Sequence, residues 1–126
     1  MKKIITTLNA PTPIGPYNQA VLANGTLYIS GQIGLYPHNM EMVKGDLKKE
    51  TEQVMENLKS VLDAAEMNFN HVVKSSIFLE NMDDFSAVNE VYGAYFDNET
   101  APARETIAVK TLPKKVRVEI SMIAIK

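Results

Sequence analysis

The chain has 126 residues, of which 45% are hydrophobic and 22% charged, and its formal net charge is −2. This is the size and composition of a single globular domain, which we take as residues 1–126, and the acidic balance argues against a nucleic-acid partner. The absence of cysteine excludes a thiol nucleophile, disulfides and thiolate metal sites, and two widely separated histidines, His38 and His71, argue against a zinc site.

The amino-terminal segment predicts neither a signal peptide nor a membrane span. Met1 to Ile5 contains two lysines, but no long apolar run follows them. We therefore expect a cytoplasmic protein without a membrane partner.

Ile4 to Leu8 favours a short strand, and Pro11 to Pro16 contains three prolines and a glycine that predict a stiff loop. Tyr17 ends this loop, either as a packing ring or as a lid over a pocket.

A hairpin follows the loop. Asn24-Gly25 separates the apolar runs Gln19–Ala23 and Thr26–Ser30, and this dipeptide is the strongest short hairpin signal because both central positions need a positive φ. Ser30 lacks a histidine partner, so we do not expect it to be a nucleophile. Gly31 allows a backbone or a ligand to approach closely at the end of the second strand.

The clearest helix is predicted over residues 46–66. Asp46 is a suitable N-cap. The apolar residues recur at helical spacing and form one stripe that should face the core: Leu47, Thr51, Val54, Met55, Leu58, Val61, Leu62 and Ala65.

The next two elements are a strand over Val72–Leu79 and a helix over Asn81–Asp97. The strand does not alternate strictly, which suggests burial on both faces. Asn81 or Asp83 is expected to cap the helix, with Phe85, Val88, Tyr92 and Tyr95 on its inner face and Phe96 beside them. Asn89 lies on the same helix and is either a surface or capping amide or a ligand contact.

Arg104 is placed where a rigid turn becomes a strand. Pro102 holds Ala101 extended and prevents a helix, and Thr106–Val109 is a β-branched run. The guanidinium is a planar, permanently charged fork that fits a carboxylate bidentately. The alternative is a solvated or ion-paired surface arginine.

The final strand is predicted over Val116–Ile125. One face carries only apolar residues, and the other carries Arg117, Glu119, Ser121, Ile123 and Ile125. Glu119 is thus a carboxylate in a hydrophobic strand, where it serves either an ion pair or a function. The basic residues before it are expected to form a solvated strand end: Lys110, Lys114, Lys115 and Arg117.

These elements predict an α+β fold in which a short first strand is followed by elements in the order ββαβαββ. The single mixed sheet should carry both helices on one face, because crossovers between strands of one sheet are right-handed. The other face then needs a partner, and self-association is the expected one.

Five segments in this order resemble the RidA (YjgF-like) enamine/imine deaminase family over the whole chain. They are Ile14-Gly15-Pro16-Tyr17, Ser30-Gly31-Gln32-Ile33, Val88-Asn89-Glu90-Val91-Tyr92, Pro102-Ala103-Arg104 and Val118-Glu119-Ile120. The resemblance implies a chorismate-mutase-like fold, a homotrimer with a ligand cleft at each subunit interface, and no metal or organic cofactor.

The family's chemistry implies hydrolysis of 2-aminoacrylate, 2-iminopropanoate and 2-iminobutanoate to 2-oxo acids and ammonia. By resemblance, Arg104 grips the substrate carboxylate and Glu119 positions or deprotonates the attacking water. Tyr17 and Asn89 would line the cleft, Ser30 and Gly31 would shape its floor, and the main-chain carbonyl of Thr106 would contact the substrate.

The chain departs from the family pattern at two places. Glu105-Thr106 stands where many members have Ser-Cys, and Gly34 stands where a proline is common, which should loosen the loop beside the cleft. A non-catalytic trimeric protein that binds a carboxylate metabolite in the same cleft is the alternative. That reading needs Arg104 but not Glu119.

Overall fold

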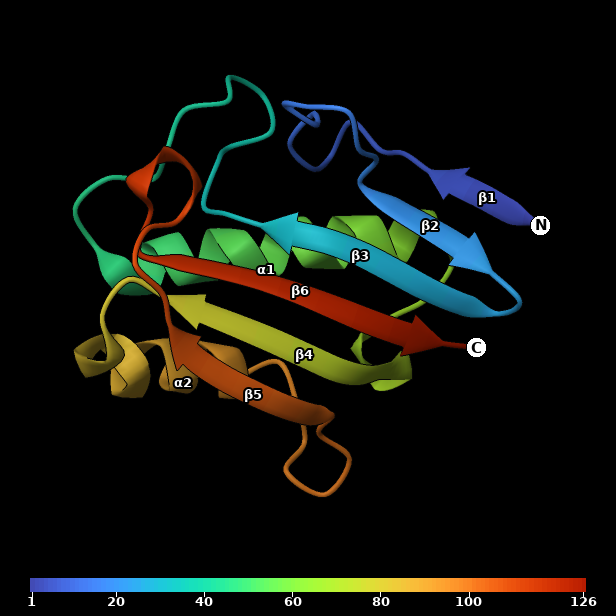
Figure 1. Cartoon of the computed structure of the whole chain (residues 1–126). Helices are drawn as coiled ribbons and strands as arrows, with labels where there is room; N and C mark the ends of the chain where they lie inside the picture. The colour runs from blue at the N-terminus through green and yellow to red at the C-terminus, as the bar shows by residue number, and fades with distance from the viewer.

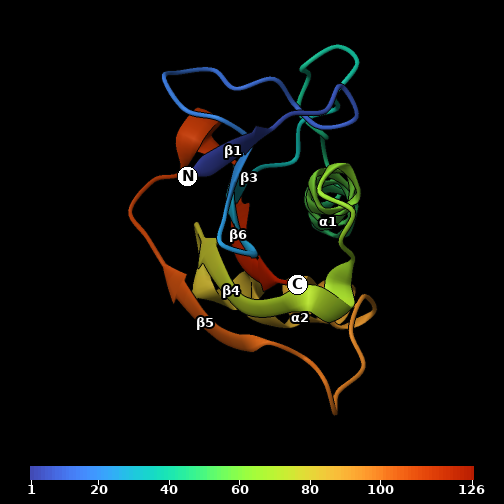
Figure 2. The same ribbon diagram turned by 90° about the vertical axis from the view of Figure 1, so that its right-hand side faces the viewer.

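The protein is one six-stranded mixed sheet with two α-helices on one face, and the computed structural model describes all residues, 1–126 (Figures 1 and 2). This confirms the predicted α+β fold. The strands are β1 (Lys2–Ile5), β2 (Ala20–Ala23), β3 (Thr26–Gln32), β4 (Val72–Leu79), β5 (Ala103–Ala108) and β6 (Val118–Ile125). The helices are α1 (Leu47–Ala64) and α2 (Phe85–Gly93), and 3-10 turns cover Phe69–His71, Met82–Asp84 and Pro113–Lys115.

The strand order is β1-β2-β3-β6-β4-β5, so β1 and β5 form the two edges. Only β4 and β5 run parallel, because α2 crosses between them, and all other neighbours are antiparallel. The last strand, β6, lies in the middle of the sheet (Figure 1). Neither α-helix has the length and hydropathy that a membrane crossing requires.

Two local predictions are confirmed at single residues. Asn24 and Gly25 join β2 to β3 with φ values of 50° and 78°, the two positive angles that this two-residue turn needs. Asp46 caps α1, where its carboxylate accepts hydrogen bonds from the backbone N–H groups of Lys48 and Lys49 at 2.8 and 3.4 Å.

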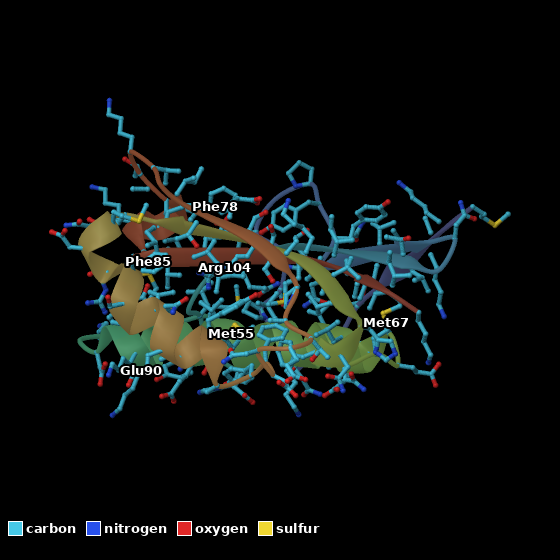
Figure 3. The ribbon with its side chains drawn as sticks, turned by 90° about the horizontal axis from the view of Figure 1, so that it is seen from below. Met55, Met67, Phe78, Phe85, Glu90 and Arg104 are labelled. Carbon is cyan, nitrogen blue, oxygen red and sulfur yellow. The ribbon has the colours of Figure 1, made fainter.

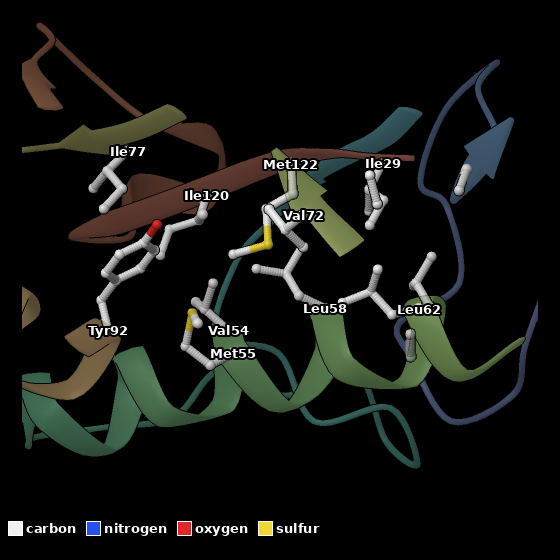
Figure 4. Packing of buried hydrophobic residues seen from close by; sticks show 14 of the residues in the cluster. Ile29, Val54, Met55, Leu58, Leu62, Val72, Ile77, Tyr92, Ile120 and Met122 are labelled. Atoms are coloured by element: carbon white, nitrogen blue, oxygen red, sulfur yellow. The ribbon is translucent and has the colours of Figure 1, made fainter. Parts of the chain in front are cut away.

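The core lies between α1, α2 and the helix-facing side of the sheet (Figure 4). The predicted stripe of α1 supplies much of it: Thr51, Val54, Met55, Leu58, Val61 and Leu62 are fully buried. The alternation predicted for the last strand is also confirmed over β6, because its core-facing side chains are all buried: Val118, Ile120, Met122 and Ala124. The predicted start at Val116 is wrong, since the strand begins at Val118 and Val116 packs in a second cluster with Ile33 and Leu112.

The prediction that β4 is buried on both faces is wrong. Its residues alternate between buried and more exposed positions, except at Val73, which is 45% exposed. Val73 is an extra residue in the pairing with β6, since Val72 pairs with Ala124 and Lys74 with Ile123. This bulge shifts the alternation by one residue and hides it in the sequence.

Two predicted element boundaries are also wrong. The second helix does not run over Asn81–Asp97, because it starts with a 3-10 turn that Asn81 caps and ends at Gly93. Residues 94–96 continue only with turn-like hydrogen bonds to the third preceding residue. The first strand ends at Ile5 rather than Leu8, and the Leu8 side chain is 90% exposed.

Buried polar side chains fix the loops at one end of the sheet. The Asn57 amide of α1 donates to the carbonyls of Ile33 and Leu35 at 3.2 and 2.9 Å. Gly34, between them, is buried against α1, and a Cβ there would stand 2.8 Å from Cγ of Glu50. Glycine at position 34 therefore permits close packing of this loop against α1.

Glu50 and Arg117 form a partly buried ion pair next to this loop. Glu50 Oε1 accepts from Arg117 Nε at 2.9 Å, and Oε2 accepts from the Arg117 backbone N–H at 3.0 Å. The side chain of Glu50 is 5% exposed and that of Arg117 33% exposed. Arg117 is thus not part of a solvated basic strand end, which corrects that expectation.

The sheet face opposite the helices remains uncovered and carries apolar side chains. Tyr28, Ile107 and Ile125 are 52%, 46% and 49% exposed, and Phe78 and Ile123 are partly exposed. An exposed apolar sheet face of this kind is typical of an association surface.

Replacing Glu50 with glutamine should lower the free energy of unfolding by roughly 3 kcal/mol, because breaking a buried pair leaves an uncompensated charge. Urea unfolding followed by circular dichroism measures the change. Lys59→Ala is the control, since it removes the exposed pair between Lys59 and Asp63 and should change stability by less than about 1 kcal/mol. Equal effects of the two substitutions would contradict a structural role for Glu50.

Candidate functional site

Arg104 is anchored against α2. It lies on the edge strand β5, in register with Ser75 of β4, and its side chain turns to the helix side of the sheet (Figure 3). Arg104 Nη1 donates to Asn89 Oδ1 at 2.7 Å. Its Cζ lies 5.1 Å from the ring centroid of Tyr92 and 5.6 Å from that of Phe85. Arg104 is therefore neither free in solvent nor ion-paired.

The rings beside Arg104 are themselves held in place. The Tyr92 hydroxyl donates to Ser75 Oγ at 2.9 Å, and both residues are buried. Burial raises the pKa of Tyr92, although the hydrogen bond that Tyr92 makes with Ser75 and the charge of Arg104 oppose this effect. Tyr92 therefore stays neutral at ordinary pH and presents its ring to the cation.

Phe85 and Tyr92, which the apolar spacing predicts on the inner face of the helix, both contact Arg104, and the sequence does not predict this contact. Phe85 is not inside: it is 38% exposed. The signal was the spacing of Phe85, Asn89 and Tyr92, which places all three on one side of a helix. We call Phe85, Asn89, Tyr92 and Arg104 the arginine group.

Thr106 lies two residues after Arg104 on the same side of β5. It is in register with the buried Ile77, and its hydroxyl oxygen is buried without a hydrogen-bond partner. Glu105, between them, points to the other side, where Lys74 forms an ion pair with it at 2.9 Å and Ser76 donates a hydrogen bond. These two contacts lower the pKa of Glu105, and the carboxylate does not neutralise Arg104.

Glu119 projects from β6 into a second candidate region of the molecule. A small cavity of about 60 Å³ is bordered by Glu119, Gly31, Tyr17 and the proline-rich loop. Burial raises the pKa of Glu119, and no charged or hydrogen-bonding group offsets this effect. A Cβ on Gly31 would stand 2.4 Å from Glu119 Oε2, so a larger residue at this position would displace the carboxylate.

Tyr17 lines the same cavity as Glu119 from the loop, and Ser30 precedes Gly31 on β3. Tyr17 is 47% exposed, and its hydroxyl accepts a long hydrogen bond, 3.4 Å, from the backbone N–H of Ile14. Ser30 Oγ donates to the carbonyl of Asn18 at 2.6 Å, so this hydroxyl is used to hold the backbone. We call Tyr17, Ser30, Gly31 and Glu119 the glutamate group.

Gln19, which the sequence analysis did not single out, fixes the loop that carries Tyr17. Its buried amide donates to the carbonyls of Thr7, Ala10 and Pro11 and accepts from the Thr7 backbone N–H at 2.7 Å. No sequence pattern identifies such a residue, because its partners are backbone atoms about ten residues away.

The two groups lie on opposite faces of the sheet. Glu119 pairs with Phe78 of β4, whereas Arg104 pairs with Ser75. Ser75 is buried toward the helices and Phe78 lies on the uncovered face (Figure 3). Side chains that are an odd number of residues apart on one strand point to opposite faces. One chain therefore does not bring Arg104 and Glu119 together, and a site that contains both needs two copies.

The chain offers no metal site in addition to these groups. No cluster of three or more histidine, aspartate or glutamate side chains is close enough to hold an ion. What the groups provide is a fixed cation on one face and a desolvated carboxylate with a raised pKa on the other.

Comparisons with known proteins identify the family of this chain. Residues 7–126 match the model of the family described as Endoribonuclease L-PSP. The chain is 50% identical over 126 residues to a RutC family protein of Pyrococcus horikoshii, covering 100% of this chain and 99% of that one. It is 45% identical to the 2-iminobutanoate/2-iminopropanoate deaminase of Mus musculus, covering 100% and 93%.

A solved structure shows the same fold. The crystal structure of RidA from the Antarctic bacterium Psychrobacter sp. superposes with a TM-score of 0.94 at 42% identity, covering 98% of this chain and 99% of that one. The family match and the full-length identities leave no other assignment: this chain belongs to the RidA (YjgF/RutC) family.

Proposed function

We propose that this protein hydrolyses small reactive 2-imino acids, namely 2-iminopropanoate, 2-iminobutanoate and the enamine 2-aminoacrylate, to 2-oxo acids and ammonia. The observation that carries the proposal is the anchored guanidinium of Arg104. It has one nitrogen bound to Asn89 and two rings against its faces, and its remaining N–H groups suit a carboxylate. The deaminase name of the mouse relative supports the same activity.

We propose that the working site forms between subunits of a homotrimer. The arginine group of one subunit would face the glutamate group of the next, because no single subunit can bring them together. The uncovered apolar face, with Tyr28, Ile107 and Ile125, supports association of this kind. Subunit contact would also remove water from Glu119 and strengthen its interaction with the substrate.

The proposed reaction needs one carboxylate base and no cofactor. Arg104 holds the substrate carboxylate, which fixes the imine carbon in front of a water next to Glu119. The water oxygen bonds to this carbon, and one water proton passes through Glu119 to the imine nitrogen, which gives a carbinolamine. Glu119 then transfers the hydroxyl proton of the carbinolamine to its amino group. The C–N bond breaks as the carbonyl forms, and ammonia leaves.

We favour this reaction over ribonuclease activity, which the description of the family model names. The chain has a net charge of −2, and Arg104 lies in a cradle of aromatic rings and an amide. Binding to nucleic acid depends on basic side chains that contact many phosphates.

Arg104→Lys should lose most of the activity, because an ammonium point charge cannot reproduce the two parallel hydrogen bonds of the fork. We expect kcat/KM to fall roughly 10- to 100-fold, which corresponds to one or two charge-assisted hydrogen bonds. Serine dehydratase can generate 2-aminoacrylate in the assay, and the release of pyruvate is followed. Lys110→Ala, which removes an exposed cation on the loop that follows β5, is the control. Equal activity of Arg104→Lys and the wild type would contradict the proposal.

Glu119→Gln should slow turnover by about 10²-fold or more, because it removes the base, while the affinity for pyruvate stays the same. The wild-type rate should fall with acidification at a higher pH than for an ordinary glutamate, since burial raises the pKa of Glu119. A carboxyl group whose pKa is raised in the folded state stabilises the fold at low pH. This stabilisation is lost as the pH rises through the folded-state pKa.

Glu119→Gln should therefore raise the Tm at neutral pH, so that unfolding cannot explain its lost activity. The Tm is measured by differential scanning calorimetry at pH 7 and pH 4, and the gain should shrink at the lower pH. Unchanged turnover in the variant would remove Glu119 from the mechanism and favour a binding protein.

Mixed trimers test the shared site. Arg104→Ala and Glu119→Gln subunits, each inactive alone, are unfolded together at equal concentrations and refolded. About one quarter of the interfaces should then pair an intact Arg104 with an intact Glu119 of the neighbour, so about a quarter of the wild-type activity should return. No recovery would show that each subunit contains a complete site.

A further inference from the structure

Two buried glutamines line the cavity beside Glu119, and they differ in how their amides are bonded. Gln19 is 3% exposed and Gln32 is 6% exposed. The Gln19 amide makes four hydrogen bonds with backbone atoms of residues 7–11. The Gln32 amide makes none with the protein, although buried amides are nearly always paired. The proposed reaction also leaves Gln32 without a role.

The unpaired amide of Gln32 borders space that a water molecule can reach. Thr106 Oγ1 is the only polar side-chain atom that is both fully enclosed by protein and without a partner. The amide atoms of Gln32 are therefore not enclosed in this way. Gln32 lines the cavity beside Glu119 and none of the other cavities of the subunit, so its amide faces this one.

The pairing of β3 with β6 brings Gln32 close to Glu119. Gln32 ends β3 and pairs with Ile120, the residue after Glu119 on β6. The chain advances three residues from Ile29 to Gln32, whereas the paired segment of β6 advances two, from Met122 to Ile120. A bulge of this kind re-aims a side chain and is frequent beside active sites. The end of β3 therefore presents Gln32 to the same cavity as Glu119.

The cavity suits a bound water molecule. Its volume of about 60 Å³ exceeds the roughly 10–15 Å³ that one water needs. A buried water also needs about two to four polar partners, and the cavity offers an amide and a carboxylate that the protein leaves unpaired. No cationic side chain lines it, and Tyr17 is the only other titratable residue there. A neutral amide can accept a hydrogen bond from this water without taking its proton.

We propose that Gln32 is a second contact of the attacking water, together with Glu119. The inference rests on the proposed function for the reaction itself. The water would donate one hydrogen to the Glu119 carboxylate and the other to Gln32 Oε1, so that a lone pair of its oxygen points to the imine carbon. Glu119 takes the proton as the C–O bond forms, and the Gln32 amide keeps its own protons. Gln32 thus orients the water that Glu119 activates.

Gln32→Met tests this role, because methionine has a similar length and no amide. We expect kcat for 2-aminoacrylate hydrolysis to fall about tenfold or more, which corresponds to one lost hydrogen bond in the transition state. The affinity for pyruvate, which Arg104 provides, should stay the same. The water also solvates the ionised carboxylate, so its loss should raise the pKa of Glu119. The fall of the rate on acidification should then move to higher pH by about 0.5 to 1 unit.

The two glutamines also separate a structural role from a chemical one. Gln19→Met should lower the Tm by several degrees, because it leaves backbone groups unpaired. Gln32→Met removes no hydrogen bond within the protein, so its Tm should change much less. Lys59→Met introduces the same side chain at an exposed position of α1 and should change neither kcat nor the pH profile.

The pKa of Glu119 can also be measured without catalysis, by carbon NMR of its labelled carboxyl group in the substrate-free protein. It should be higher in Gln32→Met than in the wild type. Equal pKa values, or an unchanged kcat in the variant, would overturn the inference. Failure of the proposed function looks different: the wild type then hydrolyses no imine, while the pKa of Glu119 still differs between the two proteins.

Discussion

Side chains alternate between the two faces of a strand, and this constraint decides where the functional groups of the protein can meet. The helices cover one face of the sheet, where Arg104 and Thr106 project from β5. Glu119 projects from β6 toward the other face. Each face therefore carries one of the two groups that the proposed reaction needs: the Arg104 cation on one face and the Glu119 carboxylate on the other. In the proposed function, a second copy would complete the site at the open apolar surface next to Glu119.

The arginine is useful because it is fixed before a ligand arrives. An exposed arginine would lose side-chain freedom on binding, and that loss would weaken the complex. Here Asn89 and the rings of Phe85 and Tyr92 restrict the guanidinium, and Ser75 restricts Tyr92. All of these contacts come from elements that pack in the core. The packing of the fold therefore also fixes the side chains of the site.

Sequence patterns predicted the parts of the fold that depend on local chemistry. The Asn24-Gly25 turn, the Asp46 cap and the stripe of α1 each follow from properties of neighbouring residues. The bulge at Val73 could not be predicted, because it is defined by the pairing of β4 with β6. For the same reason the buried polar residues Gln19, Glu50 and Asn57 were missed, since each is satisfied by backbone or charge far along the chain.

The candidate site was predictable as a set of residue types but not as an arrangement. Arg104 and Glu119 stand out because a cation after a rigid turn and a carboxylate in an apolar strand are both unusual. Their separation by the sheet is not visible in the sequence, because it depends on the register of β5 and β6 with β4, which lies between them. The contact of Arg104 with Phe85 depends on where α2 packs, which only the assembled core decides.

The position of β5 at the margin of the sheet ties ligand binding to local order. One side of this strand is joined to β4, whereas the other side has no neighbouring strand. The contacts of Arg104 with α2 thus hold β5, the outermost strand, in place. An anion that immobilises the guanidinium would strengthen these contacts. Ligand occupancy and the local stability of the sheet edge should therefore rise and fall together.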